Sequence, residues 1–311
     1  MCASVATPEK CTSGARILGK VGGFAISSNV FYYYVRMDID LLALAFTTLH
    51  WKEARKAEVW EEYRANESSA LSPEERKELD SLSNKIKSLR DEAVSLGANL
   101  VLPGDAKAAH LQEELPYPVA LWAQGTLPPP SACLAVVGSR ASSEGGRKRA
   151  LRIGRDLTEA GVGVISGLAR GIDAAAHVGA IEVGPTWGIL GSGLKNPYPA
   201  ENIPLMNRIV KTGGGVITCF PPDAKPHKWH FPRRNLLMAA WTKGVVVVEA
   251  GARSGSLLTA KLALDLGKEV WAIPGPPDDP HSEGTNAFLR EGAAKFARGA
   301  KDILEDLSSL F

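Results

Sequence analysis

From Leu134 onward the chain alternates short β-rich runs with helical stretches, and this alternation limits the possible folds more than any other feature. It predicts an α/β fold with a mostly parallel sheet and right-handed crossovers. Four consecutive valines, Val245–Val248, are typical of a central strand that is buried on both faces. The predicted strands are Leu134–Val137, Val162–Ile165, Thr186–Leu190, Gly215–Cys219, Gly244–Glu249 and Glu269–Ile273, and the predicted helices include Gly146–Ala160, Ile172–Val183, Pro204–Lys211 and Leu257–Leu266.

The chain before these strands has a different character. Residues 1–102 read as a mostly helical N-terminal region, in which Ser72 has the pattern of an N-cap before a helix that ends near Gly97, and Trp51 and Trp60 pack inward. Residues 103–130 are rich in proline, which holds an extended backbone, so we predict a linker there. Residues 131–311 form the predicted α/β domain.

Composition excludes several classes of protein. The net charge of +2 is too small to indicate nucleic-acid binding by itself, so any positive site must be local. The four cysteines form no CxxC pair and no HExxH sequence is present, so we expect no metal site. No run of about 18 apolar residues exists, and we expect a protein of the reducing cytoplasm without a membrane span.

Four predicted strands lead into loops of glycine and small hydroxylated residues. In an open α/β sheet the carboxyl ends of the strands meet a ligand, and free N–H groups at helix N-termini bind phosphate. Each loop alone is equally compatible with a tight turn. The sequence has no GxxxxGK[ST], no complete GxGxxG and no GxSxG motif. The loops are Gly138-Ser139-Arg140, Ser166–Gly171, Gly191-Ser192-Gly193 and Ser254-Gly255-Ser256, followed by Thr259.

Seven ordered blocks over about residues 115–307 resemble the signature of the DNA processing protein A (DprA/Smf) family. The blocks are Ala135–Arg140, Ser166–Asp173 with His177, Gly191–Gly193 with Tyr198-Pro199, Phe231–Asn235, Val248–Ala250 with Ser254–Ala260, Pro274-Gly275, and Gly284–Asn286 with Gly292-Ala293. Because the order and the residues both match, the resemblance is far more specific than any single motif.

The resemblance implies an extended Rossmann-like fold, with helices on both faces of the sheet. It implies a protein that binds single-stranded DNA without catalysis, has no cofactor, and passes the strand to the RecA recombinase as a homodimer during natural transformation or recombination. Many members carry a C-terminal winged helix, which we do not expect here because the sequence stops at Phe311. Residues 1–100 do not match the N-terminal domain of the family.

The family motifs also imply a site for DNA phosphates. Arg140 and Arg233 are the expected phosphate contacts. Phe231 either stacks a base or belongs to the core, and Asn235 caps a helix. Asp173 is expected to stabilise the turn at Gly171 or to hold Arg170, and to pair with His177. The full predicted set is Gly138, Ser139, Arg140, Ser166, Gly167, Arg170, Gly171, Phe231, Arg233, Asn235, Ser254, Gly255, Ser256 and Thr259.

Two alternatives use the same fold. Nucleoside-monophosphate phosphoribohydrolases carry a catalytic glutamate where this chain has Thr259, and threonine cannot act as a carboxylate base. A nucleotide-binding sensor that signals without chemistry stays open. We therefore predict no catalytic residue.

Overall fold

The structure, a computed structural model, describes residues 39–49, 52–64, 71–105, 108–112, 114–129 and 133–308. These residues contain a nine-stranded sheet in the order β1-β2-β6-β5-β4-β3-β7-β8-β9. All neighbours from β6 to β9 are parallel, whereas β1 and β2 are antiparallel additions at the β6 edge. The strands are β1 (Ala98–Val101), β2 (Leu121–Gly125), β3 (Cys133–Gly138), β4 (Gly163–Ser166), β5 (Thr186–Ile189), β6 (Gly215–Thr218), β7 (Gly244–Glu249), β8 (Glu269–Ala272) and β9 (Lys295–Phe296).

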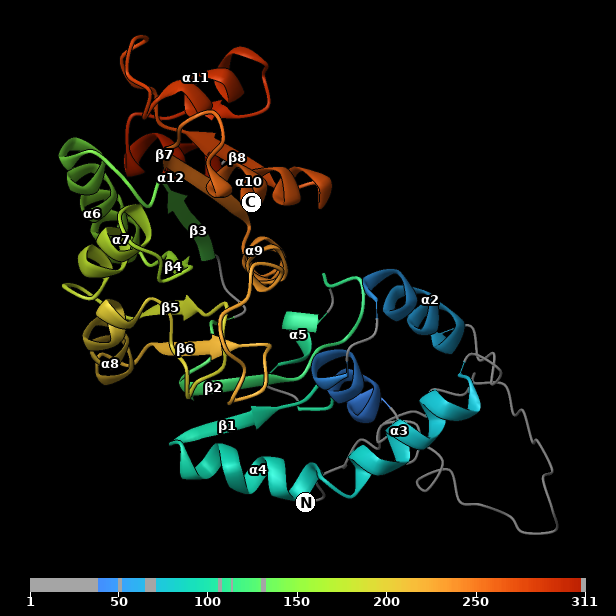
Figure 1. Cartoon of the computed structure of the whole chain (residues 1–311). Coiled ribbons are helices and arrows are strands. Elements are labelled where there is room, and N and C mark those ends of the chain that lie inside the picture. Colours follow the sequence, from blue (N-terminus) through green and yellow to red (C-terminus); the bar gives the residue numbers. More distant parts are fainter. Residues whose placement is uncertain are drawn as a thin grey trace, which may run out of the picture.

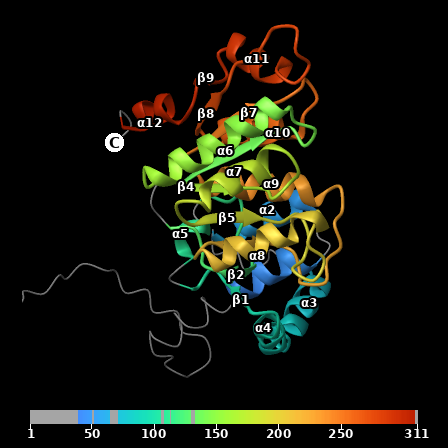
Figure 2. The same ribbon diagram turned by 90° about the vertical axis from the view of Figure 1, so that its left-hand side faces the viewer.

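The prediction of a mostly parallel α/β sheet is confirmed, and β3 to β8 each begin and end within one residue of the predicted bounds. Helices cover both faces, as expected (Figures 1 and 2). One face carries α6 (Glu144–Glu159), α7 (Ile172–Ala180), α8 (Ile203–Lys211) and α12 (Ala300–Ser308), and the other carries α9 (His230–Trp241) and α10 (Gly255–Asp265). The remaining helix of this part is α11 (Glu283–Arg290).

The valine run of β7 explains why this strand is central. Val246 and Val248 pack into the cluster beneath α6, α7 and α12, whereas Val245 and Val247 pack into the cluster on the α9 side. Successive side chains of a strand point to opposite faces, so only a strand covered on both sides buries every position. All six residues of β7 are buried.

The N-terminal part is mostly helical, with residues 39–48, α2 (Glu53–Arg64), α3 (Pro73–Ser83) and α4 (Ile86–Ser95). The capping prediction is confirmed, because the Ser72 hydroxyl accepts from the Glu75 N–H and the Glu75 carboxylate accepts from the Ser72 N–H. The predicted single helix up to Gly97 is wrong, since a turn at residues 84–85 divides it. Trp60 stacks on Tyr63 and packs against the core, and Trp51 lies outside the described residues.

The linker prediction over residues 103–130 needs a correction. This stretch contains α5 (Ala109–Gln112) and the strand β2, which pairs with both β1 and β6. Trp122 of β2 is fully buried in the cluster that also contains α9 and the N-terminal helices. The prolines therefore flank a strand of the sheet, and the division of the chain into domains stays a prediction.

Helix α9 is absent from the sequence-based expectation, because the Phe231-Pro232 pair reads as a turn. Pro232 is the third residue of the helix, within the first turn, where the missing N–H has no intrahelical partner to lose. The same helix shows that Asn235 is not a cap, since it lies in the helix interior.

Within the described residues, no helix has the length and the apolar character that crossing a membrane requires. Cys133 and Cys219 are buried, and Cys2 and Cys11 lie outside the described residues. Packing of Cys133 in the core raises the pKa of its thiol to about 12, so it stays protonated at neutral pH.

Helices α6 and α7 pack through glycines. A Cβ on Gly154 of α6 would lie 2.2 Å from the carbonyl oxygen of Ala176, and a Cβ on Gly179 of α7 would lie 1.9 Å from that of Leu151. Both obstacles are backbone atoms, which cannot move aside as a flexible side chain can. The distance between the two helices therefore depends on the absence of a side chain at these positions.

We expect Gly154→Ala to lower the free energy of unfolding by about 1–3 kcal/mol, because overpacking forces the helices apart. Gly145→Ala in the same helix is the matched control: its Cβ would meet nothing closer than 3.4 Å, the side chain of Arg149. That change should be neutral or stabilising by about 0.4–1 kcal/mol, since alanine restricts the unfolded chain. Urea titration of both variants measures the difference, and equal stabilities would contradict the packing argument.

His177 lies in the interior between α7 and β5, and the expected pair with Asp173 is wrong. Its Nδ1 lies 2.9 Å from the hydroxyl of Thr186, which donates to the Val164 carbonyl, so Nδ1 carries the proton and donates. Burial lowers the pKa of His177 to about 3, so the folded state holds a neutral imidazole.

This burial predicts a pH-dependent stability. The unfolded imidazole has a pKa of about 6.5, so below that pH the unfolded chain binds a proton that the folded chain does not bind until about pH 3. The stabilisation is complete above pH 6.5 and is lost as the pH falls. Between pH 7 and pH 5 the wild type should lose about 2 kcal/mol more than His177→Gln, in which only the other histidines contribute. Urea titrations at both pH values measure it, and equal losses in the two proteins would refute it.

Candidate nucleic-acid interface

A cleft of about 580 Å³ opens beyond the carboxyl ends of β3 and β7, and we call it the switch-point cleft. The chain proceeds from β3 through β4, β5 and β6 in one direction and then returns to place β7 on the other side of β3. Ligands of open α/β sheets bind where the strand order reverses in this way. The lining comes from Val137–Ala141, Ala169 and Asp173, from Phe231, Pro232, Arg234, Asn235 and Met238 of α9, and from Gly251–Ser256, Leu258 and Thr259.

Nine of the fourteen predicted site residues line this cleft: Gly138, Ser139, Arg140, Phe231, Asn235, Ser254, Gly255, Ser256 and Thr259. Gly167 and Arg170 line an adjoining pocket of about 330 Å³, which shares Arg140, Phe231 and Arg234 with the cleft. Ser166, Gly171 and Arg233 line neither. The structure thus brings most of the predicted set together around one edge of the sheet.

Phe231 and Arg140 form a cation–π pair at the junction of the cleft and the adjoining pocket. The Arg140 guanidinium carbon lies 4.9 Å from the Phe231 ring centroid, and Tyr198 contacts the same ring edge-on at 6.1 Å. Arg140 is exposed and Phe231 is half-buried. Phe231 therefore does not belong to the core, and an aromatic ring beside an exposed guanidinium suits a base with its phosphate.

Arg234 is the buried cation of the cleft. It donates to the carbonyls of Gly167 and Ile189 and, from Nε, to the Asn235 side chain at 2.9 Å. Burial lowers the pKa of Arg234 to about 10, so it stays charged at neutral pH. Asn235 thus orients an arginine.

Asp173 supplies the carboxylate of the cleft wall and accepts from the backbone N–H groups of Gly167 at 3.1 Å and Ala169 at 3.4 Å. Burial raises its pKa, while the nearby Arg234 acts in the opposite direction. The expectation that Asp173 stabilises the turn is supported for residues 167–169, and it does not hold Arg170. Arg170 instead forms a two-pronged ion pair with Glu201, in which both N–O distances are 2.5 Å.

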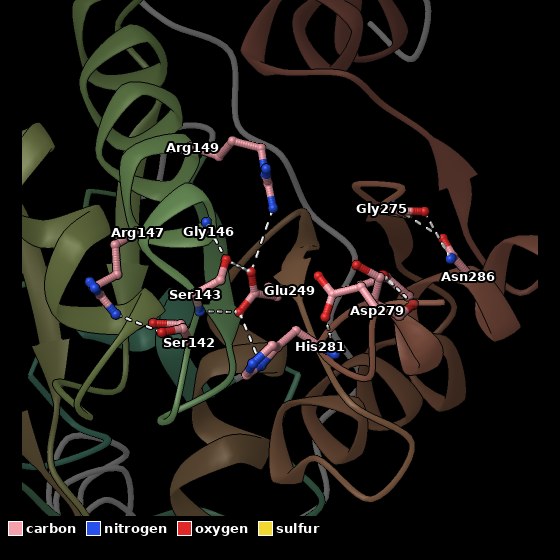
Figure 3. A network of polar contacts seen from close by, with 12 residues as sticks. Ser142, Ser143, Gly146, Arg147, Arg149, Glu249, Gly275, Asp279, His281 and Asn286 are labelled. Carbon is pink, nitrogen blue, oxygen red and sulfur yellow. Dashed lines mark hydrogen bonds and ion pairs between the residues drawn. The ribbon is translucent and has the colours of Figure 1, made fainter. Parts of the chain in front are cut away.

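The N-terminus of α6 is already occupied by a side chain of the protein (Figure 3). Glu249, at the end of β7, accepts from the Ser143 N–H at 2.7 Å and from the Ser143 hydroxyl at 2.5 Å, and Arg149 lies 3.5 Å away. The Ser139 N–H donates to the Glu249 carbonyl. An internal carboxylate therefore accepts hydrogen bonds at the N-terminus of α6, where a phosphate was expected.

The N-terminus of α10 opens into the cleft instead. Ser254 is its N-cap and accepts from the Ser256 N–H, while a Cβ on Gly255 would meet nothing within 4 Å. Arg253, one residue before the cap, is exposed and lines the cleft. An open helix N-terminus beside two exposed arginines, Arg140 and Arg253, is a favourable place for a phosphate.

Three of the predicted site residues have structural roles. The Ser166 hydroxyl donates to the Val136 carbonyl at 2.6 Å within the core. Gly171 has a φ of +74° and packs so tightly that a Cβ would lie 2.3 Å from the Ser139 carbonyl. Arg233 donates to the Phe46 carbonyl at 2.9 Å and does not line the cleft, and its role as a phosphate contact stays a prediction. The Gly191–Gly193 loop packs against the start of α9, where the Gly191 carbonyl contacts His230.

Two cations of the cleft, Arg234 and Arg253, are missing from the predicted set. A signal for Arg253 existed, because it follows the same strand end as Ser254. Arg234 required knowledge of α9, on which Phe231, Arg234, Asn235 and Met238 share one face at i, i+3, i+4 and i+7. No group of three or more potential metal ligands occurs among the residues that the structure describes.

We expect Glu249→Ala to lower the free energy of unfolding by about 1–3 kcal/mol, because the Ser143 N–H loses its acceptor at 2.7 Å. Glu249→Gln keeps an acceptor oxygen and should lose less. Urea titration gives both values. Wild-type stability in the alanine variant would show that the carboxylate does not hold the β3–α6 loop.

Comparison with known proteins places this geometry in a family. The model of the family "DNA recombination-mediator protein A" matches residues 100–308. Protein Smf of Escherichia coli is 43% identical over 193 residues, which are 61% of this chain and 51% of the relative. DNA processing protein DprA of Bacillus subtilis is 36% identical over 193 residues, which are 61% of this chain and 64% of the relative. The chain thus spans about half to two thirds of the length of these curated relatives.

Solved structures agree with the sequence comparison. The crystal structure of DNA processing protein A from Streptococcus pneumoniae is similar with a TM-score of 0.68 and 30% identity, over 87% of this chain and 97% of that chain. A second similar structure is that of DNA processing protein A from Helicobacter pylori, which is described for its unique single-stranded DNA binding mode. The TM-score is 0.59 at 24% identity, over 65% of this chain and 93% of that chain. This likeness supports the fold alone. The match over residues 100–308 shows that this chain belongs to the DNA recombination-mediator protein A family.

Proposed function

We propose that the chain binds single-stranded DNA in the switch-point cleft without transforming it chemically. The observation that carries the proposal is the convergence of Arg140, Arg234 and Arg253 with the half-buried ring of Phe231. Asp173 is the opposing carboxylate among the described lining residues, so positive charge prevails. Cations for the phosphates and an aromatic face for a base are the groups that a single strand requires.

The family relationship extends the proposal to the cell. The related proteins are named for DNA processing, and the family for mediating recombination. We therefore propose that a homodimer of this protein delivers the bound strand to a RecA-type recombinase in the cytoplasm, during natural transformation or recombination. Co-sedimentation with recombinase on single-stranded DNA, with and without this protein, tests the delivery step.

A nucleotide sensor is the second candidate, because 580 Å³ lies within the usual range of small-molecule sites. The phosphoribohydrolase alternative has less support. Thr259, which the sequence resemblance aligns with the catalytic glutamate of those enzymes, is buried in the cleft wall. Glu249 is engaged by Ser143, and Asp173 is held by two backbone N–H groups. A hydrolase would release ribose phosphate from a mononucleotide, which chromatography detects.

Anisotropy of a labelled oligo-dT over a series of salt concentrations tests the binding site. Arg140→Ala and Arg253→Ala should each weaken binding and reduce the slope of log K against log salt by about 0.7 for each lost phosphate contact. Phe231→Ala should cost about 1–3 kcal/mol if one base stacks on the ring.

The control for these variants is Arg208→Ala, which removes an exposed arginine of α8, remote from the cleft lining. Duplex DNA and mononucleotides are run beside the single strand. Tighter binding of a mononucleotide than of the strand would favour the sensor, and unchanged binding in both Arg140→Ala and Arg253→Ala would remove the assigned site.

A further inference from the structure

A second cavity, of about 630 Å³, lies on the other side of the first turn of α9, and we call it the second basic cavity. One wall comes from the N-terminal region, including Lys52 and Lys56. The other wall comes from the segment between β6 and α9, with Phe220 and Trp229, and from the first turn of α9, with Arg233. None of these residues lines the switch-point cleft.

Positive charge prevails in this cavity. Among the lining residues that the structure describes, Lys52, Lys56 and Arg233 stand against one carboxylate, that of Asp223, and Lys56 also lies over the Tyr117 ring. Burial lowers the pKa of His230, which therefore adds no charge at neutral pH. Lys52 and Arg233 by themselves attract an anion to a space of this size, and the low exposure of Arg233 (8%) weakens screening by solvent.

Arg233 has unused capacity for hydrogen bonding. Its Nη2 donates to the Phe46 carbonyl, but its buried Nε has no partner among the described residues. The charge is stabilised by the rings of Tyr117 and Phe220, each 5.8 Å from the guanidinium carbon. Buried polar groups are rarely left unsatisfied, so a ligand that accepts hydrogen bonds explains this arginine better than packing does.

An aromatic platform lies beside the cations. Trp229 is 48% exposed, although its indole is held edge-on against Phe220 at 6.0 Å and His230 at 4.1 Å. Phe220 and His230 stack on each other at 3.9 Å, which fixes the base of the platform. A large exposed ring held in place by neighbouring rings loses little conformational entropy when a base stacks on it.

We propose that the second basic cavity is a second subsite for single-stranded nucleic acid, in which the cations hold a phosphate and Trp229 stacks a base. The inference rests on the proposed function, since the same strand would occupy both sites. Trp229 and Arg233 lie on one side of the first turns of α9, and Phe231 and Arg234 on the other. A helix with its side chains is about 10–12 Å wide, so a short strand that passes around this turn joins the two sites.

Anisotropy with two labelled oligo-dT lengths tests the proposal on the full chain. A strand of about 4 nucleotides fills the switch-point cleft alone, whereas one of about 16 reaches both sites. Lys52→Ala and Trp229→Ala should weaken binding of the long strand about 5- to 10-fold and leave binding of the short strand unchanged. Arg140→Ala should weaken both. Arg233 is left intact, because its bond to Phe46 contributes to the fold.

Lys211→Ala, an exposed lysine on α8, is the matched control, and thermal unfolding checks that each variant is folded. In a second measurement, the long strand should quench tryptophan emission in the wild type more than in Trp229→Phe. The second subsite alone would be overturned by one result. In that result Arg140→Ala weakens binding of the long strand, whereas Lys52→Ala and Trp229→Ala bind it as tightly as the control variant does. Absence of binding for either strand would overturn the proposed function and this inference together.

Mononucleotides distinguish a strand from a free nucleotide at the same cavity. If dTMP quenches the emission of Trp229 and the long strand does not, the cavity is a nucleotide site and the proposal is wrong. If the long strand quenches it and a large excess of dTMP does not displace the strand, the subsite belongs to the nucleic-acid path.

Discussion

The site depends on one feature of the topology: between β6 and β7 the chain crosses back over the sheet through α9. After β6 the chain crosses the sheet to place β7 against β3, so the loops that follow β3 and β7 lie side by side at one edge. The helices that follow these two strands, α6 and α10, pack on opposite faces, which leaves a crevice between their starts. The first turns of α9 form the third wall of that crevice.

The two helix starts at this edge have opposite roles. Glu249 neutralises the start of α6 and fixes the β3–α6 loop, with Ser143 as the common partner of the carboxylate and of the Gly146 N–H (Figure 3). The start of α10 is capped by Ser254 and stays open toward the cleft. A buried carboxylate thus has a structural explanation here, and the capacity to bind an anion is shifted to the loop that carries Arg253.

Helix α9 also connects the N-terminal region to the sheet. Arg233 donates to Phe46, whose carbonyl belongs to the last turn of the helix at residues 39–48. The contact joins two parts of the chain 187 residues apart and leaves a basic, aromatic space between them. A residue that resembles a phosphate contact in the sequence therefore holds the architecture in which the second basic cavity exists.

The sequence by itself determined the parallel strands, the capping of α3 and the edge of the sheet where glycine, serine and arginine collect, because these signals lie within a few neighbouring residues. Only the tertiary structure decided which arginine of the Arg233-Arg234 pair faces the cleft, because that depends on α9, and Pro232 conceals this helix in the sequence. It also decided that Glu249 contacts Ser143, 106 residues away, and that β2 pairs with β6. Such partners meet only when the chain has folded, since no periodicity in the sequence encodes a contact between distant segments.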